Sequence, residues 1–310
     1  MNGHWDRDAL GSSLRRALPY IRLFKNKTFV IKVGGALCGE PAALAEVVEQ
    51  VAVLRELGIR VVLVHGGGPQ TTALSQKLGL ETKFVQGRRV TDEKTLEVAV
   101  MTIAGTVNTA LLSACRAAEL PAVGLSGVDA SLVVARRRPP EPVDYGLVGD
   151  IVAVDPAVLH KLLDGGFVPV VSPLCADEAG QVLNVNADTV ASRLAQSLGA
   201  DKVLFVGDTS GLLEDKADPA SLVSYTDVAG LRALREKGAL DAGMLPKARA
   251  AEEALLGGVK RVHLVGYKAR HSLLVEVFTN EGSGTLIVRE AADLSPTEQS
   301  ASAAPRAVGA

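Results

Sequence analysis

Short apolar runs alternate with segments of helical spacing along most of this chain. The runs are rich in Val, Ile and Leu, which is typical of strands buried on both faces of a parallel sheet. Because strands that alternate with helices build βαβ units, we predict an α/β fold around a mainly parallel central sheet. The expected strands are 28–33, 60–64, 121–125, 167–171, 202–206, 260–265 and 285–288, and the expected helices are 41–57, 69–79, 93–118, 187–198, 244–257 and 271–278.

Length and composition restrict the class of protein. The 310 residues, 47% of them hydrophobic, are enough for one large domain or for two lobes that share a sheet. A net charge of -2 argues against nucleic acid as the main partner. Cys38, Cys115 and Cys175 have no metal-ligand spacing, so we expect free thiols in a reducing compartment. The sequence suggests neither a signal peptide nor a membrane span, and we predict a cytoplasmic protein.

Two glycine-rich turns, Gly34–Gly35 and Gly66–Gly68, follow the first two apolar runs. Glycine N–H groups, with a helix starting just beyond each turn, can bind an anion. Lys32 interrupts the first run, where an unpaired ammonium would be costly, so it needs an anionic partner. Neither turn has the spacing of a P-loop or a Rossmann fingerprint, and either alone could be an ordinary strand-to-helix connection. Together with Lys32, the two turns predict a phosphate site.

Two later segments carry groups suited to a carboxylate. Residues 87–91, Gly-Arg-Arg-Val-Thr, precede the long helix, and arginine can bind a carboxylate with two hydrogen bonds. Residues 184–188, Asn-Val-Asn-Ala-Asp, place their polar side chains on one face if the segment is extended. The alternatives are a surface turn for the first segment and a helix cap for the second.

Two further segments are suited to a nucleotide. Residues 206–212, Val-Gly-Asp-Thr-Ser-Gly-Leu, follow an expected strand, where an α/β sheet opens its ligand crevice. Residues 241–247 place Gly243 before a helix and Lys247 in its first turn. A lysine there opposes the helix dipole, so Lys247 is a candidate to bind phosphate.

Three segments fall outside the alternating pattern. Residues 131–154 contain the run Arg136–Arg138 and should form short antiparallel strands; the arginines are expected to be solvated, with phosphate or partner binding as the alternative. An amphipathic helix is expected at 14–24, packed on the body or on another subunit. We divide the chain into an N-terminal helical extension for oligomerisation (1–25), an acceptor-substrate lobe (26–180), a nucleotide-binding lobe (181–290) and a disordered tail (291–310).

The order of these motifs resembles that of the amino acid kinase family. The resemblance runs from about Tyr20 to Val288 and rests on residues 32–35, 65–69, 87–91 and 184–188, and on Gly243-Met244 with Lys247. It implies a three-layer αβα sandwich. It also implies ATP-dependent phosphorylation of the side-chain carboxylate of N-acetyl-L-glutamate, in arginine biosynthesis. That carboxylate is already ionised at neutral pH, so the reaction needs alignment and charge stabilisation rather than a general base, and we expect His65 to be structural.

The resemblance assigns roles to matching positions. Lys32 and Lys247 would stabilise the phosphoryl group in flight, and Asp188 would hold both lysines. ATP would bring Mg²⁺, held mainly by the phosphates rather than by protein ligands. The implied substrate-binding residues are Gly67, Gly68, Arg89, Asn184 and Asn186, and the implied ATP-binding residues are Gly34, Gly35, Gly207, Asp208, Gly211, Leu212 and Gly243.

The resemblance extends to arginine-inhibited members of the family. They share an N-terminal helix and a His-Ser-Leu-Leu-x-Glu-x-Phe-Thr run, which here is residues 271–279. It implies a homohexamer built as a trimer of dimers, with a PII-type protein as a candidate partner. The residues implied to surround a bound arginine are Tyr20, Lys202, His263, Glu276, Gly282 and Gly284.

Two segments depart from the family pattern. After the strand that carries His263 the family usually has Asp-Gly, whereas this chain reads Val265-Gly266-Tyr267; residues 207–209 read Gly-Asp-Thr in place of Thr-Asp-Val. Two other functions are consistent with the sequence. One is a kinase of the same fold for carrier-protein-bound aminoadipate or glutamate in lysine or ornithine synthesis, docked through Arg136–Arg138. The other is a non-catalytic arginine sensor, against which the lysines and Asp188 argue.

Overall fold

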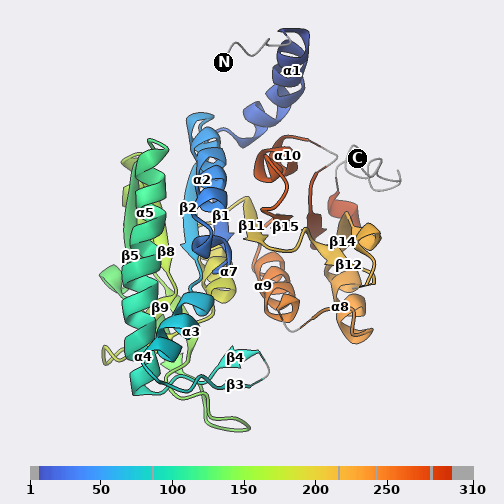
Figure 1. Ribbon diagram of the computed structural model, residues 1–310. Coiled ribbons are helices and arrows are strands. Elements are labelled where there is room, and N and C mark those ends of the chain that lie inside the picture. The colour runs from blue at the N-terminus through green and yellow to red at the C-terminus, as the bar shows by residue number, and fades with distance from the viewer. Residues whose placement is uncertain (1–6, 86, 216, 242, 280–281, 295–310) are drawn as a thin grey trace.

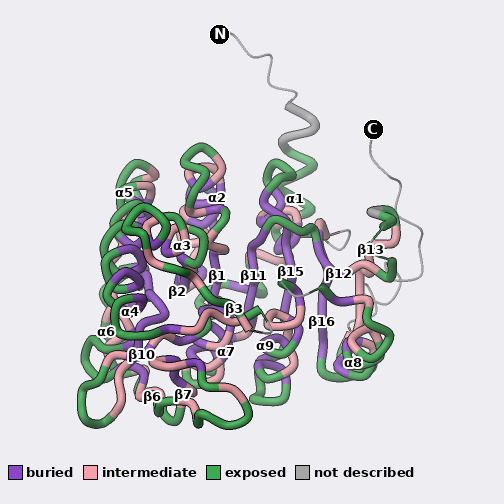
Figure 2. The backbone as a smooth tube through the Cα atoms, turned by 60° about the horizontal axis from the view of Figure 1, so that its bottom comes forward, coloured by how far each residue is buried: buried purple, intermediate pink, exposed green. Residues whose placement is uncertain are grey.

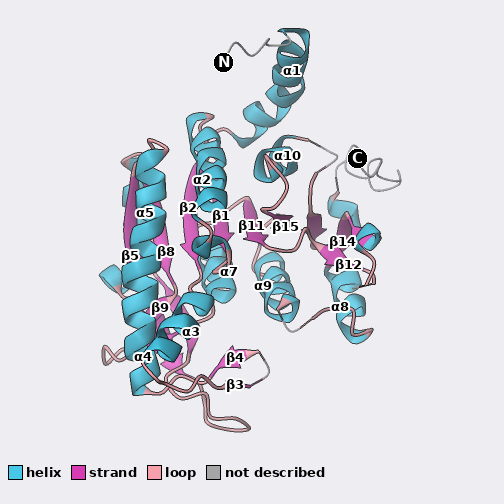
Figure 3. Ribbon diagram, in the orientation of Figure 1, coloured by secondary structure: helices cyan, strands magenta, loops and turns pink. Residues whose placement is uncertain are grey.

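The computed structural model describes residues 7–85, 87–215, 217–241, 243–279 and 282–294. Its centre is an eight-stranded sheet in the order β14-β16-β15-β11-β1-β2-β8-β5 (Figure 1, Figure 3). β14 and β16 run antiparallel to the other strands of this sheet, which are parallel. The predicted α/β fold with a mainly parallel sheet is confirmed. The strands are β1 (Thr28–Val33), β2 (Arg60–His65), β5 (Ala122–Ser126), β8 (Val168–Ser172), β11 (Lys202–Gly207), β14 (Tyr225–Asp227), β15 (Arg261–Gly266) and β16 (Thr285–Val288).

Helices cover both faces of the sheet and bury one hydrophobic cluster on each. Side chains alternate along β1: Ile31 belongs to the cluster beneath α2 and α5, and Val30 to the cluster beneath α7 and α9. Lys32 therefore shares the face of Val30, toward α7. The predicted helices are present, and α6 and α8 are additional. The helices are α1 (Arg7–Phe24), α2 (Pro41–Glu56), α3 (Gly68–Lys77), α4 (Glu93–Ala99), α5 (Asn108–Ala117), α6 (Ala157–Asp164), α7 (Ala187–Ser197), α8 (Val228–Glu236), α9 (Met244–Leu256) and α10 (Ser272–Phe278).

The chain also forms a second, four-stranded sheet, separate from the central one. Its order is β10-β9-β6-β7, and the antiparallel pairing of β6 with β7 confirms the strands expected within 131–154. Short two-stranded sheets form from β3 with β4 and from β12 with β13. These strands are β3 (Phe84–Val85), β4 (Arg88–Arg89), β6 (Val133–Arg137), β7 (Gly149–Val154), β9 (Leu174–Ala176), β10 (Val182–Asn184), β12 (Leu212–Leu213) and β13 (Leu222–Val223).

The two ends of the chain differ from the prediction in extent. The expected helix at 14–24 begins earlier, and α1 projects from the body (Figure 1). Its last turns pack on the body, where the Phe24 ring meets the Phe29 ring edge-on at 5.3 Å. The predicted disordered tail is wrong for its first residues, because Ala291–Asp293 form a 3-10 turn closed by a capping box. Residues 295–310 lie outside the described residues.

One long helical segment combines α4, a π-helical stretch at Val100–Val107 and α5. By length and composition, it is the one helix in the described part of the chain that could cross a membrane. This corrects our expectation that no segment resembles a membrane span. The apolar residues of this helix pack on β5, β8 and α2. Figure 2 shows that buried residues gather between the helices and the sheet, and 44% of the apolar window of this helix is buried inside the protein.

Candidate active site

The two glycine turns lie side by side at the carboxyl ends of β1 and β2. Val33 pairs with His65, and the N–H of Gly66 donates to the Val33 carbonyl at 2.9 Å. A Cβ atom on Gly66 would lie 3.1 Å from the nitrogen of Gly35, and one on Gly35 would lie 3.2 Å from the nitrogen of Gly67. The turns therefore approach this closely because neither has side chains at these positions. The two turns thus meet at one edge of the sheet, where the N–H of Gly66 is already bonded to Val33.

Lys32 finds its anionic partner in Asp188, at the start of α7. Lys32 Nζ lies 2.7 Å from Asp188 Oδ1, and the side chains are 8% and 6% exposed. Asn186 caps α7, because its side-chain oxygen accepts the N–H groups of Asp188 at 2.8 Å and Thr189 at 3.3 Å. The alternative of a helix cap is thus correct for Asn186, and the cap fixes Asp188 opposite Lys32.

Lys247 approaches the same edge from the first turn of α9. A Cβ atom on Gly207, the last residue of β11, would lie 3.6 Å from Lys247 Cε. Lys247 Nζ donates to the Gly243 carbonyl at 3.4 Å, whereas Asp188 pairs directly with Lys32. Asp188 makes its direct ion pair with Lys32, and its charge also acts against the burial that lowers the pKa of Lys247, so the role of Asp188 in holding both lysines stays a prediction. Burial lowers the pKa of Lys247, and the charge of Lys32 lowers it further.

Arg89 places its guanidinium beside the second glycine turn. From β4, its Nη2 donates to the Gly68 carbonyl at 2.9 Å and to Thr72 Oγ1 at 2.6 Å, and its guanidinium stacks on the Phe84 ring at 4.8 Å. Its Nη1 is buried with no hydrogen-bond partner among the described residues. Burial lowers the pKa of Arg89. Because buried charged donors are normally paired, the free Nη1 marks a place for an anionic group.

Asn184 connects the second sheet to the Arg89 segment. Its Nδ2 donates to Thr91 Oγ1 at 3.2 Å, and its N–H donates to the Leu147 carbonyl at 2.9 Å. A cavity of about 460 Å³ lies between these groups and the glycine turns. The predicted residues that line the cavity are Lys32, Gly35, Gly67, Gly68, Arg89, Asn184, Asn186 and Asp188.

Five charged residues of this cavity are not predicted as site residues: Arg88, Arg138, Asp150, Arg249 and Glu253. Arg138 Nε lies 3.1 Å from both carboxylate oxygens of Asp150, across the β6–β7 pair. The solvated surface expected for the arginine run is correct for its first two members and wrong for Arg138. Asp150 lies opposite Arg136 in the strand register, so Arg138 reaches its carboxylate diagonally, and only the presence of both charges on two neighbouring expected strands signalled the contact.

The residues assigned to ATP divide into two groups. The Gly34 N–H already donates to the Val206 carbonyl at 3.0 Å, so the expectation that this N–H lines the phosphates is corrected. Leu212 is a core residue whose N–H donates to Thr285 Oγ1 at 2.9 Å, and a Cβ on Gly211 would lie 2.4 Å from the same oxygen. Both residues therefore fix their loop against β16. The other residues assigned to ATP lie near the two lysines. Gly35 lines the cavity with Lys32, and Gly207 packs near Lys247 Cε. The Gly243 carbonyl accepts from Lys247 Nζ, and the charge of Asp208 acts against the burial that lowers the pKa of Lys247.

His65 is structural, as predicted. Its ring is fully buried, with Nδ1 2.9 Å from the Gly66 carbonyl and Nε2 3.0 Å from Asn108 Nδ2. Burial lowers the pKa of His65 to about 4, so the ring is neutral at pH 7. Nδ1 carries the proton, because the Gly66 carbonyl can only accept and the Asn108 amide donates to Nε2. Neither nitrogen is available as a general base.

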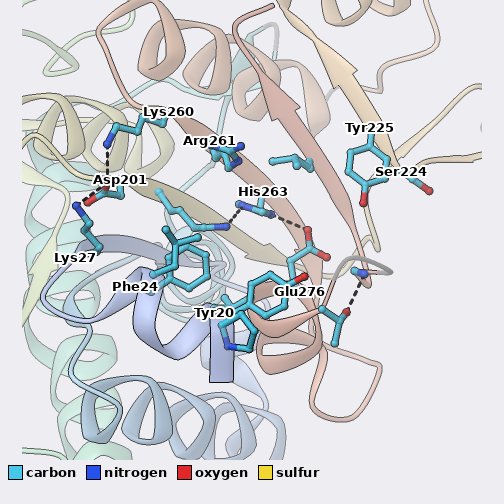
Figure 4. Close-up of a pocket in the computed structure, with 17 residues that line it drawn as sticks. Tyr20, Phe24, Lys27, Asp201, Ser224, Tyr225, Lys260, Arg261, His263 and Glu276 are labelled. Atoms are coloured by element: carbon cyan, nitrogen blue, oxygen red, sulfur yellow. Dashed lines mark hydrogen bonds and ion pairs between the residues drawn. The ribbon is translucent and has the colours of Figure 1, made fainter. Parts of the chain in front are cut away.

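A second cavity, of about 640 Å³, lies between α1 and the strands β11 and β15 (Figure 4). Lys202 Nζ lies 3.0 Å from His263 Nε2, and His263 Nδ1 lies 2.7 Å from Glu276 Oε1. Glu276 Oε2 accepts the N–H groups of Ser283 at 2.6 Å and Gly284 at 2.9 Å. Tyr20 lines the cavity from α1, and Gly282 lines it beside the Ser283 turn. The predicted arginine-site residues are thus brought together, with Gly284 behind the carboxylate.

The buried chain of Lys202, His263 and Glu276 has a definite protonation. Burial and the charge of Lys202 lower the pKa of His263 to about 4, so His263 is neutral at pH 7 and donates through Nδ1. Burial raises the pKa of Glu276, but the hydrogen bonds from His263, Ser283 and Gly284 outweigh it and bring the pKa to about 2. Glu276 is therefore a buried carboxylate that keeps its negative charge.

Comparison with known proteins places this geometry in a family. The chain matches the model of the amino acid kinase family over residues 27–266, and it belongs to this family. It is 47% identical over 290 residues to the acetylglutamate kinase of Myxococcus xanthus, covering 90% of this chain and 94% of that protein. It is 42% identical to the chloroplastic acetylglutamate kinase of Arabidopsis thaliana, and the match covers 88% of this chain and 79% of that protein.

Solved structures share the fold. An N-acetylglutamate synthase from Neisseria gonorrhoeae, complexed with coenzyme A and N-acetyl-glutamate, superposes with a TM-score of 0.81 at 30% identity. The match covers 91% of this chain and 64% of the synthase, so this chain spans less than two thirds of that protein. The same synthase complexed with coenzyme A and L-arginine superposes with a TM-score of 0.79 at 28% identity. Carbamate kinase from Giardia lamblia bound to AMP-PNP shares the fold, with a TM-score of 0.62 at 18% identity.

The two buried histidines predict a pH dependence of stability. His65 and His263 have folded-state pKa values of about 4, below the usual 6.5. Between these values the unfolded chain binds more protons, so the free energy of unfolding should rise as the pH rises from about 4 and level off above about 6.5. Urea unfolding across this window measures it. His263→Gln should reduce the slope of the free energy of unfolding against pH by the contribution of about one proton. A stability independent of pH in this window would contradict the neutral, buried state of both rings.

Proposed function

We propose that the protein transfers the γ-phosphoryl group of ATP to the side-chain carboxylate of N-acetyl-L-glutamate, giving N-acetyl-L-glutamyl 5-phosphate for arginine biosynthesis. One observation carries the proposal: the Lys32–Asp188 pair, the paired glycine turns and the unpartnered Arg89 donor line one cavity. The acetylglutamate kinases at 47% and 42% identity support the choice of donor and acceptor. We keep the cytoplasm as the proposed location, which suits the three free cysteines.

The acceptor would bind at the Arg89 end of the cavity. N-acetylglutamate carries two carboxylates, and the free Nη1 of Arg89 with the nearby Asn184 amide would hold the one that does not react. The other would then face the glycine turns. It is ionised at pH 7, so one of its oxygens can attack the γ-phosphorus directly while the bond to the bridging oxygen breaks and ADP leaves. This chemistry needs no general base, which is consistent with a His65 ring that cannot accept a proton from the substrate.

The transfer itself would depend on positioned positive charge. Lys32 Nζ, fixed by Asp188, and Lys247 Nζ, at the start of α9, would stabilise the negative charge on the phosphoryl oxygens. The N–H groups of Gly35 and Gly67 would do the same from the glycine turns, where a Cβ atom does not fit. Mg²⁺ carried by the ATP phosphates would offset their charge when bound.

Trapping the product tests this proposal. The protein is incubated with ATP and hydroxylamine, which converts an acyl phosphate into a hydroxamate, and with N-acetyl-L-glutamate, N-succinyl-L-glutamate or carrier-protein-bound aminoadipate. We expect hydroxamate chiefly from N-acetyl-L-glutamate. Lys32→Ala should lower the rate by about 100-fold or more, because it removes charge aimed at the transition state. Lys161→Ala, at an exposed position on α6, is the control. No hydroxamate from N-acetyl-L-glutamate, or a clear preference for the carrier-bound acceptor, would refute the proposal.

We also propose that the second cavity binds arginine as an inhibitor. The charged, buried Glu276 carboxylate suits a guanidinium, and α1 closes the cavity with Tyr20. The related synthase complexed with L-arginine supports this choice of ligand.

α1 would link subunits into a hexamer, a trimer of dimers, through apolar side chains such as Leu14 and Leu23, which are 60% and 62% exposed. A PII-type protein would be a further partner of that hexamer.

Separate sites for catalysis and inhibition predict separable variants. Glu276→Gln keeps the shape but removes the charge, so the arginine concentration for half-inhibition, relative to the variant's own uninhibited rate, should rise by about tenfold or more. Lys32→Ala should lose turnover while its arginine affinity, measured by calorimetry, stays within about twofold of the parent. Glu97→Gln, at an exposed position on the long helix, controls for the loss of one carboxylate. A parallel loss of turnover and arginine affinity in Lys32→Ala would contradict two sites.

A further inference from the structure

Tyr267 belongs to the Val265-Gly266-Tyr267 sequence, to which the proposed function gives no role. It follows β15 directly, and its N–H donates to the carbonyl of Gly207, the last residue of β11, at 3.0 Å. Its side chain is 7% exposed and belongs to the hydrophobic cluster that contains Leu37. Tyr267 is therefore anchored at the carboxyl edge of the sheet, beside the segment assigned to the nucleotide.

The hydroxyl of Tyr267 reaches from this edge to the loop that follows β1. Its Oη donates to Glu40 Oε1 at 2.6 Å. Glu40 ends the 3-10 turn Leu37–Gly39 and begins α2, where its carbonyl accepts the N–H of Leu44 at 2.9 Å. One hydrogen bond thus joins the end of β15 to the start of α2, 227 positions apart in the sequence.

The loop 34–40 is held at both ends by this arrangement. At its start, the Gly34 N–H donates to the Val206 carbonyl at 3.0 Å. Within it, the Gly35 carbonyl accepts from Gln70 Nε2 at 2.7 Å. At its end, Glu40 is held by Tyr267. Gly35, which meets the second glycine turn, lies between these attachments.

We propose that Tyr267 is a positioning residue for phosphoryl transfer: its hydroxyl, bound to Glu40, holds the loop 34–40 so that the Gly35 N–H stays aimed at the transferring group. This inference rests on the proposed function, which gives that N–H its role. In this role Tyr267 acts through Glu40 rather than on a reacting atom. The loop is thereby organised before the substrates bind, and this lowers the free energy needed to reorganise it in the transition state.

The surroundings of Tyr267 suit this role. The hydrogen bond to Glu40, with burial, raises the pKa of Tyr267 to about 12, so the hydroxyl remains a donor at neutral pH. The segment after Tyr267 is attached to α2 independently of the Tyr267 hydroxyl. The backbone N–H groups of Leu273 and Leu274 donate to the side-chain oxygen Oε1 of Gln50, on α2, at 3.0 and 3.3 Å. Loss of the hydroxyl alone should therefore leave the fold intact.

Tyr267→Phe removes the hydroxyl and keeps the ring. We expect kcat to fall by about three- to tenfold, while KM for ATP and for N-acetyl-L-glutamate changes by less than about twofold, because a group aimed at the transition state affects kcat more than ground-state binding. Glu40→Ala should give the same loss, and the two together no more than either alone. Glu40→Gln should recover most of the rate, because its amide oxygen can accept the same bond. Glu49→Ala, at an exposed position on the same helix, is the matched control and should keep the parental kinetics.

Three outcomes would overturn the inference: a Tyr267→Phe variant with the parental kcat, a change confined to KM, or a Glu40→Gln variant as slow as Glu40→Ala. Thermal unfolding of each variant is recorded alongside, and a melting temperature that falls in step with kcat assigns Tyr267 a merely structural role. The parental hydroxamate yield is measured in the same series. A parent that makes none refutes the proposed function, whereas an active parent with an unaffected Tyr267→Phe variant refutes only the positioning role.

Discussion

The buried ion pair between Lys32 and Asp188 is the interaction on which the rest of the site depends. It joins the middle strand β1 to the helix α7, and so connects the strand before the first glycine turn to the helix that follows the Asn184 segment. A buried pair contributes little net stability, whereas removing one partner costs about 3–5 kcal/mol. The pair is thus better explained by chemistry than by stability: it holds an ammonium, dry and oriented, beside the paired glycine turns.

Small residues and backbone groups place the remaining parts around this pair. Gly35 and Gly66 let two loops meet where a side chain would separate them, and Asn186 caps α7 so that Asp188 faces β1. On the other side of the sheet the same chain builds a second, independent charged site. There Glu276 keeps its charge because a neutral histidine and two backbone N–H groups donate to it. Both sites follow one rule: a buried charge is retained only where its partners are fixed.

The sequence predicted the strands and helices of the main sheet well, because apolar runs and glycine turns determine them locally. It also predicted Lys32 from a charge inside an apolar run, and Arg89 and Asp188 from polar motifs and the family resemblance. Arg138 was missed because its place in the cavity depends on the pairing of β6 with β7. The Gly34 N–H was misassigned for a similar reason: its partner, the Val206 carbonyl, comes from a distant strand. Local pattern specifies the elements, and tertiary pairing decides which of their polar groups remain available.

If the buried pair orients the ammonium, Lys32 and Asp188 act as one unit in the transfer. The most direct test is a double-mutant cycle on turnover at saturating substrate, with Lys32→Met, Asp188→Asn and the double variant, each verified as folded by circular dichroism. If the two residues form a unit, the double variant loses no more than about threefold beyond the slower single variant. Losses that multiply across the two positions would show independent roles and contradict the claim.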